Sequence, residues 1–227
     1  MVLTEILFWT FFGVVFYTYL GYGVLLFVLV WIKERLIFKP EAALQKELEF
    51  PEISLLIPAY NEESVVQSKM ENTLKLNYPD QKLKILWITD GSTDLTNEIL
   101  TRNYPQAKLL FEPKRGGKTA AINRAMKHIN TPIVVFTDAN TMLNSDALVE
   151  IARAFEDSNV GCVAGEKRVK SKESDGAASS GEGIYWRYES YLKMLDSRLN
   201  TTVGAAGELF AIRTSLYEEM ENDTLLD

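Results

Sequence analysis

The sequence predicts an α/β fold, with a mostly parallel sheet and flanking helices, preceded by one transmembrane helix. Two observations carry this prediction. Residues 6–32 contain no Asp, Glu, Lys, Arg or His, and a helix of this length covers roughly 40 Å, enough to cross a hydrocarbon core of about 30 Å. After Pro51, short apolar runs alternate with amphipathic stretches, which is typical of parallel βαβ units.

Composition excludes several classes of protein and site. Of 227 residues, 47% are hydrophobic and 24% are charged, which is ordinary for a folded globular chain. Cys162 is the one cysteine and His128 the one histidine, so a disulfide framework, a thiolate zinc cluster and a multi-histidine site are all excluded. The net charge of −7 argues against nucleic acid as a partner, although a local basic pocket still suits a small anion.

The apolar segment 6–32 has three interpretations, of which an uncleaved anchor fits best. A buried helix of a soluble domain would rarely stay uncharged on every face for so long. A cleavable signal peptide needs a basic start and a small-residue cleavage site, and residues 1–5 carry no Lys or Arg. Lys33, Arg35 and Lys39 follow the segment, so the positive-inside rule predicts an integral cell-membrane protein whose remaining chain is cytoplasmic.

The rest of the chain divides into a linker and a folded domain. Residues 1–5 form a short flank, 33–50 a juxtamembrane helix or linker, and 51–227 the domain. Within it we expect a glycine-rich loop at 170–183 that could act as a lid, Cys162 in the core and His128 exposed. The expected strands are 53–57, 84–89, 107–111, 132–137, 160–164 and 208–213, and the expected helices are 62–74, 94–102, 117–129, 145–155, 184–195 and 214–220.

Polar groups follow four successive predicted strands. They are the segments 58–62, 90–94, 113–118 and 138–140. The carboxyl ends of parallel strands lie at one edge of a sheet, where ligands of such folds bind. The pattern therefore predicts one site for a nucleotide with a diphosphate.

Each segment also has a purely structural interpretation. Asp90 can accept bonds from a nucleobase or ribose, but Asp-Gly is equally typical of a turn. The basic loop 114–118 opens a helix, where phosphate binds well, but it also reads as a solvated turn. A P-loop is excluded because Glu112 stands where that motif needs glycine.

Asp138 and Asn140 are candidate metal ligands. Strand alternation points them to one side and turns Ala139 to the other. Two oxygen ligands suit Mg²⁺ or Mn²⁺ bridging a diphosphate. Capping of the next helix is the alternative.

In this order and spacing the motifs resemble family 2 glycosyltransferases of the GT-A fold. The resemblance covers about residues 51–227, and the run of motifs is more specific than any one of them. The anchored layout is similar to membrane-bound synthases of the cellulose, poly-N-acetylglucosamine and hyaluronan kind. The matching segments are ISLLIPAYNEE at 53–63, ILWITDGSTD at 85–94, RGGKTAAIN at 115–123, FTDAN at 136–140 and GAAGELFAIR at 204–213.

The resemblance implies a role for each matching position. Asp90 would hold the base or ribose, Lys118 would lie near the base or phosphates, and Asp138 would be the first acidic residue of the family's D-x-D element, binding the diphosphate and its metal with Asn140. The nucleotide site would also include Pro58, Ala59, Tyr60 and Glu62, and the acceptor site would include Gly207 and Glu208.

Two departures from the family pattern matter. Asn140 replaces the second acidic residue of D-x-D, so one charge is lost and metal affinity should be weaker. The family's catalytic acidic element, followed by Q-x-x-R-W, should begin where Leu225-Leu226-Asp227 stand. Asp227 is the tentative base, and an acidic residue at position 228, if present, would be the better one. We therefore expect a fragment of a longer enzyme or a truncated copy.

The resemblance implies a membrane-anchored, inverting, metal-dependent glycosyltransferase that uses a UDP-sugar and a glycan or lipid-linked acceptor. We expect this stretch to bind nucleotide more readily than it transfers sugar. Membrane oligomers or a synthase complex would be further partners. The alternatives are a polyprenyl-phosphate sugar transferase and a noncatalytic membrane-anchored nucleotide-binding module. The aromatic run 185–191 is expected to serve packing or the membrane face, with sugar stacking on Trp186 as an alternative.

Overall fold

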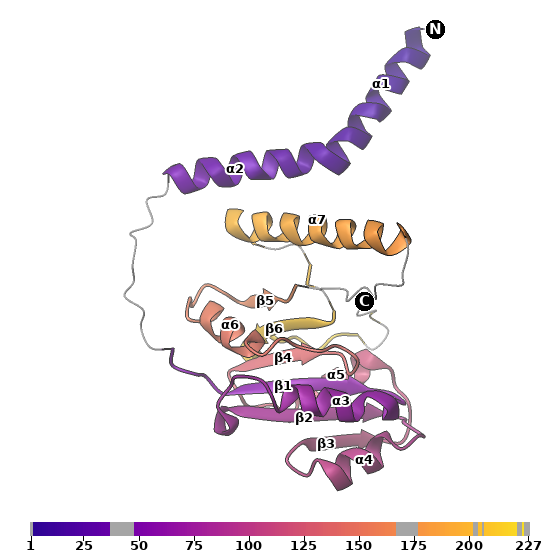
Figure 1. Cartoon of the computed structure of the whole chain (residues 1–227), viewed down its shortest axis with the longest axis vertical. Helices are drawn as coiled ribbons and strands as arrows, with labels where there is room; N and C mark the ends of the chain where they lie inside the picture. The colour runs from indigo at the N-terminus through magenta and orange to yellow at the C-terminus, as the bar shows by residue number, and fades with distance from the viewer. Residues whose placement is uncertain are drawn as a thin grey trace. The chain divides into compact units, whose positions relative to one another are not determined.

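The computed structural model describes residues 2–36, 48–166, 177–201, 204–205, 207–221 and 224. The chain forms two compact units, residues 1–46 with 167–204 and residues 47–166 with 205–227 (Figure 1). Residues 167–204 thus group with the N-terminal segment and not with the sheet.

The larger unit is built on a six-stranded sheet of order β3-β2-β1-β4-β6-β5. β1 pairs in parallel with both β2 and β4, and β2 pairs in parallel with β3. β6 lies between β4 and β5 and is antiparallel to both. The strands are β1 (Ile53–Ala59), β2 (Leu83–Asp90), β3 (Lys108–Glu112), β4 (Ile133–Thr137), β5 (Cys162–Ala164) and β6 (Leu209–Arg213).

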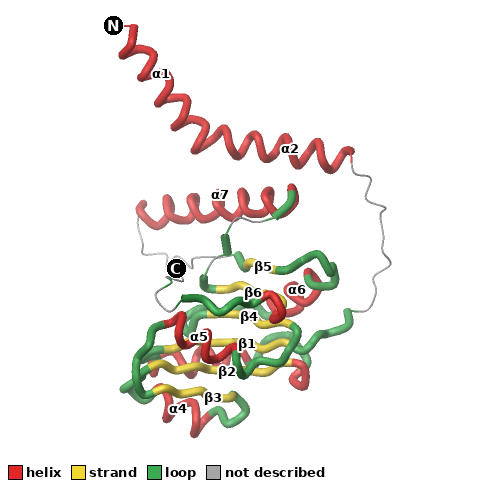
Figure 2. Tube along the Cα trace, turned by 180° about the vertical axis from the view of Figure 1, so that it is seen from behind, coloured by secondary structure: helices red, strands yellow, loops and turns green. Residues whose placement is uncertain are grey.

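Helices cover both faces of this sheet. One face packs against α3 (Glu63–Thr73), α4 (Thr96–Asn103) and α6 (Ala147–Ala154). The other packs against α5 (Lys118–Met126), which Figure 2 shows from its own side. Two single 3₁₀ turns, Asp80–Lys82 and Thr214–Leu216, complete the described elements of this unit.

β1 shows why its sequence is an unbroken apolar run. Ile53, Leu55 and Ile57 point into the core under α3 and α6, whereas Leu56 points into the core under α5. Side chains alternate along a strand, so a strand covered on both faces needs apolar residues at every position. Each such side chain contributes roughly 1.5–3 kcal/mol on burial.

Three local expectations are wrong. Residues 214–220 form one 3₁₀ turn followed by non-helical chain, because Tyr217 and Met220 are tied to α5 by bonds described below. Helix α7 (Ala177–Leu199) includes residues 177–183, the second half of the expected loop 170–183, and the first half lies outside the described residues. Cys162 is exposed, because β5 is the edge strand of the sheet. His128 is exposed as expected, just after α5.

The smaller unit contains a long apolar helix. Val2–Leu36 is continuous, with α1 (Val2–Phe16) and α2 (Tyr22–Leu36) joined by five residues of π-helix, Tyr17–Gly21. Within the described residues it is the one helix long and apolar enough to cross a membrane. Nearly all of its large apolar side chains are exposed, unlike those of the helices packed on the sheet of the larger unit.

Helix α7 packs along α2. Leu26 and Val30 of α2 form a buried cluster with Leu195 of α7. Lys33 Nζ donates to the carbonyls of Arg198 and Leu199, at 3.0 and 2.6 Å. A lysine at a helix C-terminus satisfies its free carbonyls and complements its dipole, so the C-terminal end of α7 is fixed to α2.

Candidate functional site

The strand order places the site. Strands β3, β2, β1 and β4 form a doubly wound parallel sheet in which the order reverses between β1 and β4. Ligands of such sheets bind at this reversal, beside the carboxyl ends of the strands. A cavity of about 380 Å³ begins there. It is lined by Pro58, Lys118, Ile122, Phe136, Thr137, Asp138, Ala205, Gly207, Phe210, Ile212, Leu216, Tyr217, Glu218 and Met220.

The turns after β1 and β2 are bonded to each other. Asn61 adopts a left-handed backbone, with φ of 54°, which asparagine tolerates better than most residues. Its side-chain Oδ1 accepts from the Thr93 N–H at 2.8 Å, and its own N–H donates to Ser92 Oγ at 3.1 Å. The Glu62 N–H donates to Thr96 Oγ1 at 2.8 Å. These bonds hold Tyr60 and Glu62 in fixed places at the strand ends.

Asp94 holds the starts of two helices. Its carboxylate accepts from the N–H of Glu63, at the start of α3, and of Thr96, at the start of α4. Glu63 returns a bond by accepting from the Leu95 N–H at 2.9 Å. Burial acts to raise the pKa of Asp94, but these bonds outweigh it and the net pKa is lowered. Asp94 therefore accepts from the first backbone N–H of α3 and of α4 and joins the two helix starts.

Asp90 fastens the basic loop to the end of β2. Its Oδ2 accepts from the N–H groups of Gly116 and Gly117, both at 2.7 Å, and its Oδ1 pairs with Arg124 at 3.3 Å. Its side chain is 5% exposed. These bonds agree with the structural interpretation of the Asp-Gly pair, and contact with a base or ribose stays a prediction.

The loop approaches β2 so closely that only glycine fits at position 91. Gly91 has φ of +72°, and a Cβ there would lie 2.9 Å from the backbone nitrogen of Arg115. The guanidinium of Arg115 lies 3.8 Å from the centre of the Tyr60 ring. A cation over an exposed ring contributes about 0.5–1 kcal/mol. Tyr60 and Arg115, from different strand ends, thus form one exposed surface.

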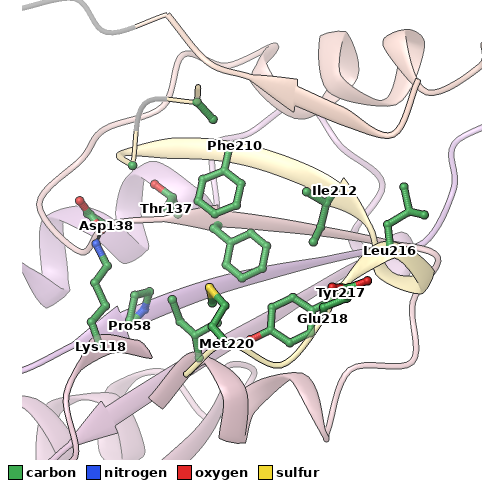
Figure 3. Close-up of a pocket in the computed structure, with 14 residues that line it drawn as sticks. Pro58, Lys118, Thr137, Asp138, Phe210, Ile212, Leu216, Tyr217, Glu218 and Met220 are labelled. Atoms are coloured by element: carbon green, nitrogen blue, oxygen red, sulfur yellow. Dashed lines mark hydrogen bonds and ion pairs between the residues drawn. The ribbon is translucent and has the colours of Figure 1, made fainter. Parts of the chain in front are cut away.

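Asp138 and Lys118 face each other at one end of the cavity (Figure 3). Lys118 Nζ lies 2.8 Å from Asp138 Oδ1, and the side chains are 37% and 29% exposed. Asp138 follows β4 and Lys118 is the first residue of α5. Ala139 is buried and Asn140 is exposed, and both lie in the turn after β4, not in a continued strand on which side chains would alternate.

Asp138 and Asn140 fit a divalent cation only together with a ligand. Among the described residues no three His, Cys, Asp or Glu side chains gather closely enough to hold a metal. Mg²⁺ is commonly held by one or two protein oxygens plus substrate phosphates and water. Glu62 is a further acidic group nearby, because its pKa is raised first by burial and then by the carboxylates of Asp138 and Asp94.

Most of the remaining cavity lining is apolar, with Thr137, Tyr217 and Glu218 as further polar residues. Phe136 of β4 and Phe210 of β6 stack with ring centres 4.5 Å apart. Asn123 of α5 accepts from Tyr217 Oη and donates to the Met220 carbonyl, so it ties the last described segment to α5. Burial raises the pKa of Tyr217 to about 12, with a smaller contribution from Glu219.

The predicted acceptor and catalytic residues are only partly placed. Gly207 lines the cavity, and Glu208 directly precedes β6. Asp227 lies outside the described residues. Pro58 lines the cavity, and Ala59 is buried at the end of β1.

Sequence reasoning missed Lys69. It lies on α3, is fully buried, and its Nζ donates to Thr137 Oγ1 at 2.9 Å. Burial lowers its pKa to about 8, and Asp138 opposes this shift. The sequence signal that could have revealed its burial is its place beside Met70, on the apolar stripe of the helix that also contains Val66.

Comparisons with known proteins identify the family of the chain. The family model "Glycosyl transferase family 2" matches residues 54–221. A β-monoglucosyldiacylglycerol synthase of Nostoc is 29% identical over 175 residues, covering 73% of this chain and 36% of that protein. A poly-β-1,6-N-acetyl-D-glucosamine synthase of Staphylococcus epidermidis is 33% identical over 126 residues, covering 54% of this chain and 30% of that protein.

A solved structure has a similar fold. The mannosyltransferase PcManGT from Pyrobaculum calidifontis, in complex with GDP-Man and Mn²⁺, is 27% identical with a TM-score of 0.64, covering 83% of this chain and 52% of that one. The predicted GT-A fold, a mostly parallel sheet with flanking helices after one apolar helix, is thereby confirmed. This chain spans about a third of the curated relatives' length. The family model covers most of the chain, and the protein belongs to glycosyl transferase family 2.

Proposed function

We propose that this chain carries the donor site of a membrane-anchored glycosyltransferase that transfers a sugar from a nucleotide-diphosphate sugar, with UDP as the favoured nucleotide. The observation that carries the proposal is the Asp138–Lys118 pair at the reversal of strand order. Both side chains are partly exposed. The carboxylate can therefore give up the ammonium for a metal ion, and the ammonium can give up the carboxylate for a diphosphate. The Mn²⁺ complex of the similar mannosyltransferase supports the metal.

Each group has a role in this proposal. Tyr60 and Glu62 would line the nucleoside at the end of β1, and Asp90, whose carboxylate holds the basic loop, would border it at the end of β2. Lys118 would hold the diphosphate at the start of α5, where backbone N–H groups also favour an anion. Asp138 and Asn140 would hold Mg²⁺ or Mn²⁺, which neutralises the charge that develops on the departing diphosphate.

The reaction would proceed with inversion at the anomeric carbon. A carboxylate removes the proton of the acceptor hydroxyl as its oxygen forms a bond to that carbon and the bond to the diphosphate breaks. Asp227 is the tentative base, or a residue just after it. The acceptor would enter beside Gly207 and Glu208.

The acceptor is a glycan or a lipid-linked molecule, and the similarity to a glucosyldiacylglycerol synthase and a poly-N-acetylglucosamine synthase supports both. The apolar helix Val2–Leu36 supports anchoring in the cell membrane with the sheet unit in the cytoplasm. A polyprenyl-phosphate acceptor is the nearest variant. A noncatalytic membrane-anchored nucleotide-binding module is the second candidate, because the residues proposed to bind nucleotide would serve it equally well.

UDP binding by the detergent-solubilised chain tests the proposal. We expect Asp138→Ala to weaken UDP binding at least tenfold by calorimetry in 1 mM MnCl₂, about 1.4 kcal/mol, because the metal loses its charged ligand. ATP should not compete. Asp80→Ala, an exposed aspartate at the start of a 3₁₀ turn, is the matched control and should bind like wild type. Equal affinity in the Asp138 variant and wild type would refute the assignment.

A further inference from the structure

Lys69 is a buried cation without an ion pair among the described residues. Its side chain is fully buried on α3, and Nζ donates to Thr137 Oγ1 at 2.9 Å and to the Thr141 carbonyl at 2.5 Å. Burial of an ammonium in a protein core is costly even when it is hydrogen bonded. Since an apolar side chain would fill the same space at lower cost, stability alone does not explain a lysine here.

Both hydrogen-bond partners of Lys69 flank the candidate metal ligands. Thr137 is the last residue of β4 and Thr141 comes four residues later, so the ammonium closes the turn that carries Asp138 and Asn140. Thr141 also donates its N–H to the Asp138 carbonyl at 3.2 Å. The position of the turn therefore depends on the ammonium behind it.

A second residue of α3 holds the same segment. Asn72 lies one turn after Lys69, donates to the Leu143 carbonyl and accepts from the Leu143 N–H, each at 2.8 Å. One face of α3 is thus bonded to residues 137–143. Asn72 carries no charge, so position alone could be fixed without lysine.

The positive charge of Lys69 interacts with Asp138, the candidate metal ligand in this turn. Asp138 is the acidic group that opposes the pKa shift of Lys69, so the two charges interact across the turn. Lys118 contacts Asp138 from the cavity side at 2.8 Å. Asp138 therefore lies between two cations, and a buried charge is screened less than an exposed one.

We propose that Lys69 is a positioning residue of the diphosphate site, which fixes the turn at 137–141 and supplies buried positive charge behind it. This inference rests on the proposed function. It predicts that Lys69 discriminates between ligands by phosphate charge. A diphosphate gains from the buried ammonium, and a nucleoside without phosphate does not.

The test compares UDP with uridine on the full chain in detergent, with 1 mM MnCl₂. Lys69→Gln keeps a hydrogen-bond donor without the charge, and Lys69→Met removes both. We expect UDP affinity to fall about tenfold in Lys69→Gln and further in Lys69→Met, while uridine affinity stays within twofold of wild type. Lys75→Met, at an exposed lysine just after α3, removes the same charge from the surface and should change neither.

Each result decides between the alternatives. Equal loss of UDP and uridine binding, with a lower Tm, would mean that Lys69 is only structural and would overturn the inference. So would unchanged UDP affinity in Lys69→Gln. If the wild-type chain itself binds no UDP, the proposed function fails and this inference falls with it, whereas failure of the variants alone leaves the proposed function intact.

Discussion

Asp90 and Asp138 both stand at the carboxyl end of an apolar strand of the sheet, yet their surroundings differ. The Asp90 side chain is 5% exposed and takes bonds from two backbone N–H groups and one arginine. The Asp138 side chain is 29% exposed and has one lysine partner at the cavity. The same sequence signal, an aspartate after a strand, therefore gives a residue that holds the protein together in one case and a residue open to ligand in the other.

Removal of the Asp90 carboxylate should give the largest loss of stability. Asp90→Ala leaves Arg124 without its carboxylate and frees the N–H groups of Gly116 and Gly117. Breaking a buried ion pair by removing one partner costs roughly 3–5 kcal/mol, so Tm should fall by about 6–20 °C. Thermal unfolding followed by circular dichroism measures this.

Asp90→Asn keeps one acceptor oxygen and should recover part of the loss. A Tm of Asp90→Ala equal to wild type would show that the loop is held by other contacts. In that case Asp90 would be as available to a ligand as Asp138, and the comparison between them would fail.

The sequence predicted most strands because their burial leaves a direct signal. β1 and β4 are apolar at almost every position, as expected when both faces are covered. The place of β6 was not predictable, because antiparallel pairing with both β4 and β5 depends on the chain between β5 and β6 and not on the composition of the strand. The prediction of a helix after β6 was wrong for a related reason, because Asn123 holds this segment through hydrogen bonds between residues far apart in sequence.

The sequence predicted which residues form the site but not the hydrogen bonds and ion pairs that those residues make. Asp138, Lys118 and Pro58 do meet at one cavity. That Asp90 is bonded to the basic loop, and that Lys69 supports the Asp138 turn, depends on contacts between residues far apart in sequence. Local spacing cannot show which of two aspartates keeps its oxygens free.

The second largest effect on stability should come from Lys69, whose ionisation should make the free energy of unfolding depend on pH. Its pKa is about 8 in the folded chain and 10.5 as an ordinary lysine. Between these values the unfolded chain binds more protons, so the free energy of unfolding should rise with pH, by at most about 3 kcal/mol. Below pH 8 both states are protonated and the cost of burying the charge is present in full.

The measurement is the free energy of unfolding from urea titrations at pH 7 to 10, in wild type and in Lys69→Met. The difference between the two isolates Lys69 from groups that titrate in both proteins. Wild type should gain stability relative to the variant as pH rises. If the free energy of unfolding changed with pH equally in both proteins, the Lys69 ammonium would be well solvated. The contrast between the buried side of Asp138, next to Lys69, and its exposed side at the cavity would then be weaker.

The smallest effect on stability should come from Asp138 itself. Asp138→Ala breaks the ion pair with Lys118, but both side chains are about a third exposed, and pairs of this kind contribute about 0–1 kcal/mol. The free energy of unfolding in urea should therefore change by less than about 1 kcal/mol, far less than in Asp90→Ala. A loss as large as that of Asp90→Ala would mean that Asp138 also holds the fold together, and that the cavity end of β4 is less open to ligand than its exposure indicates.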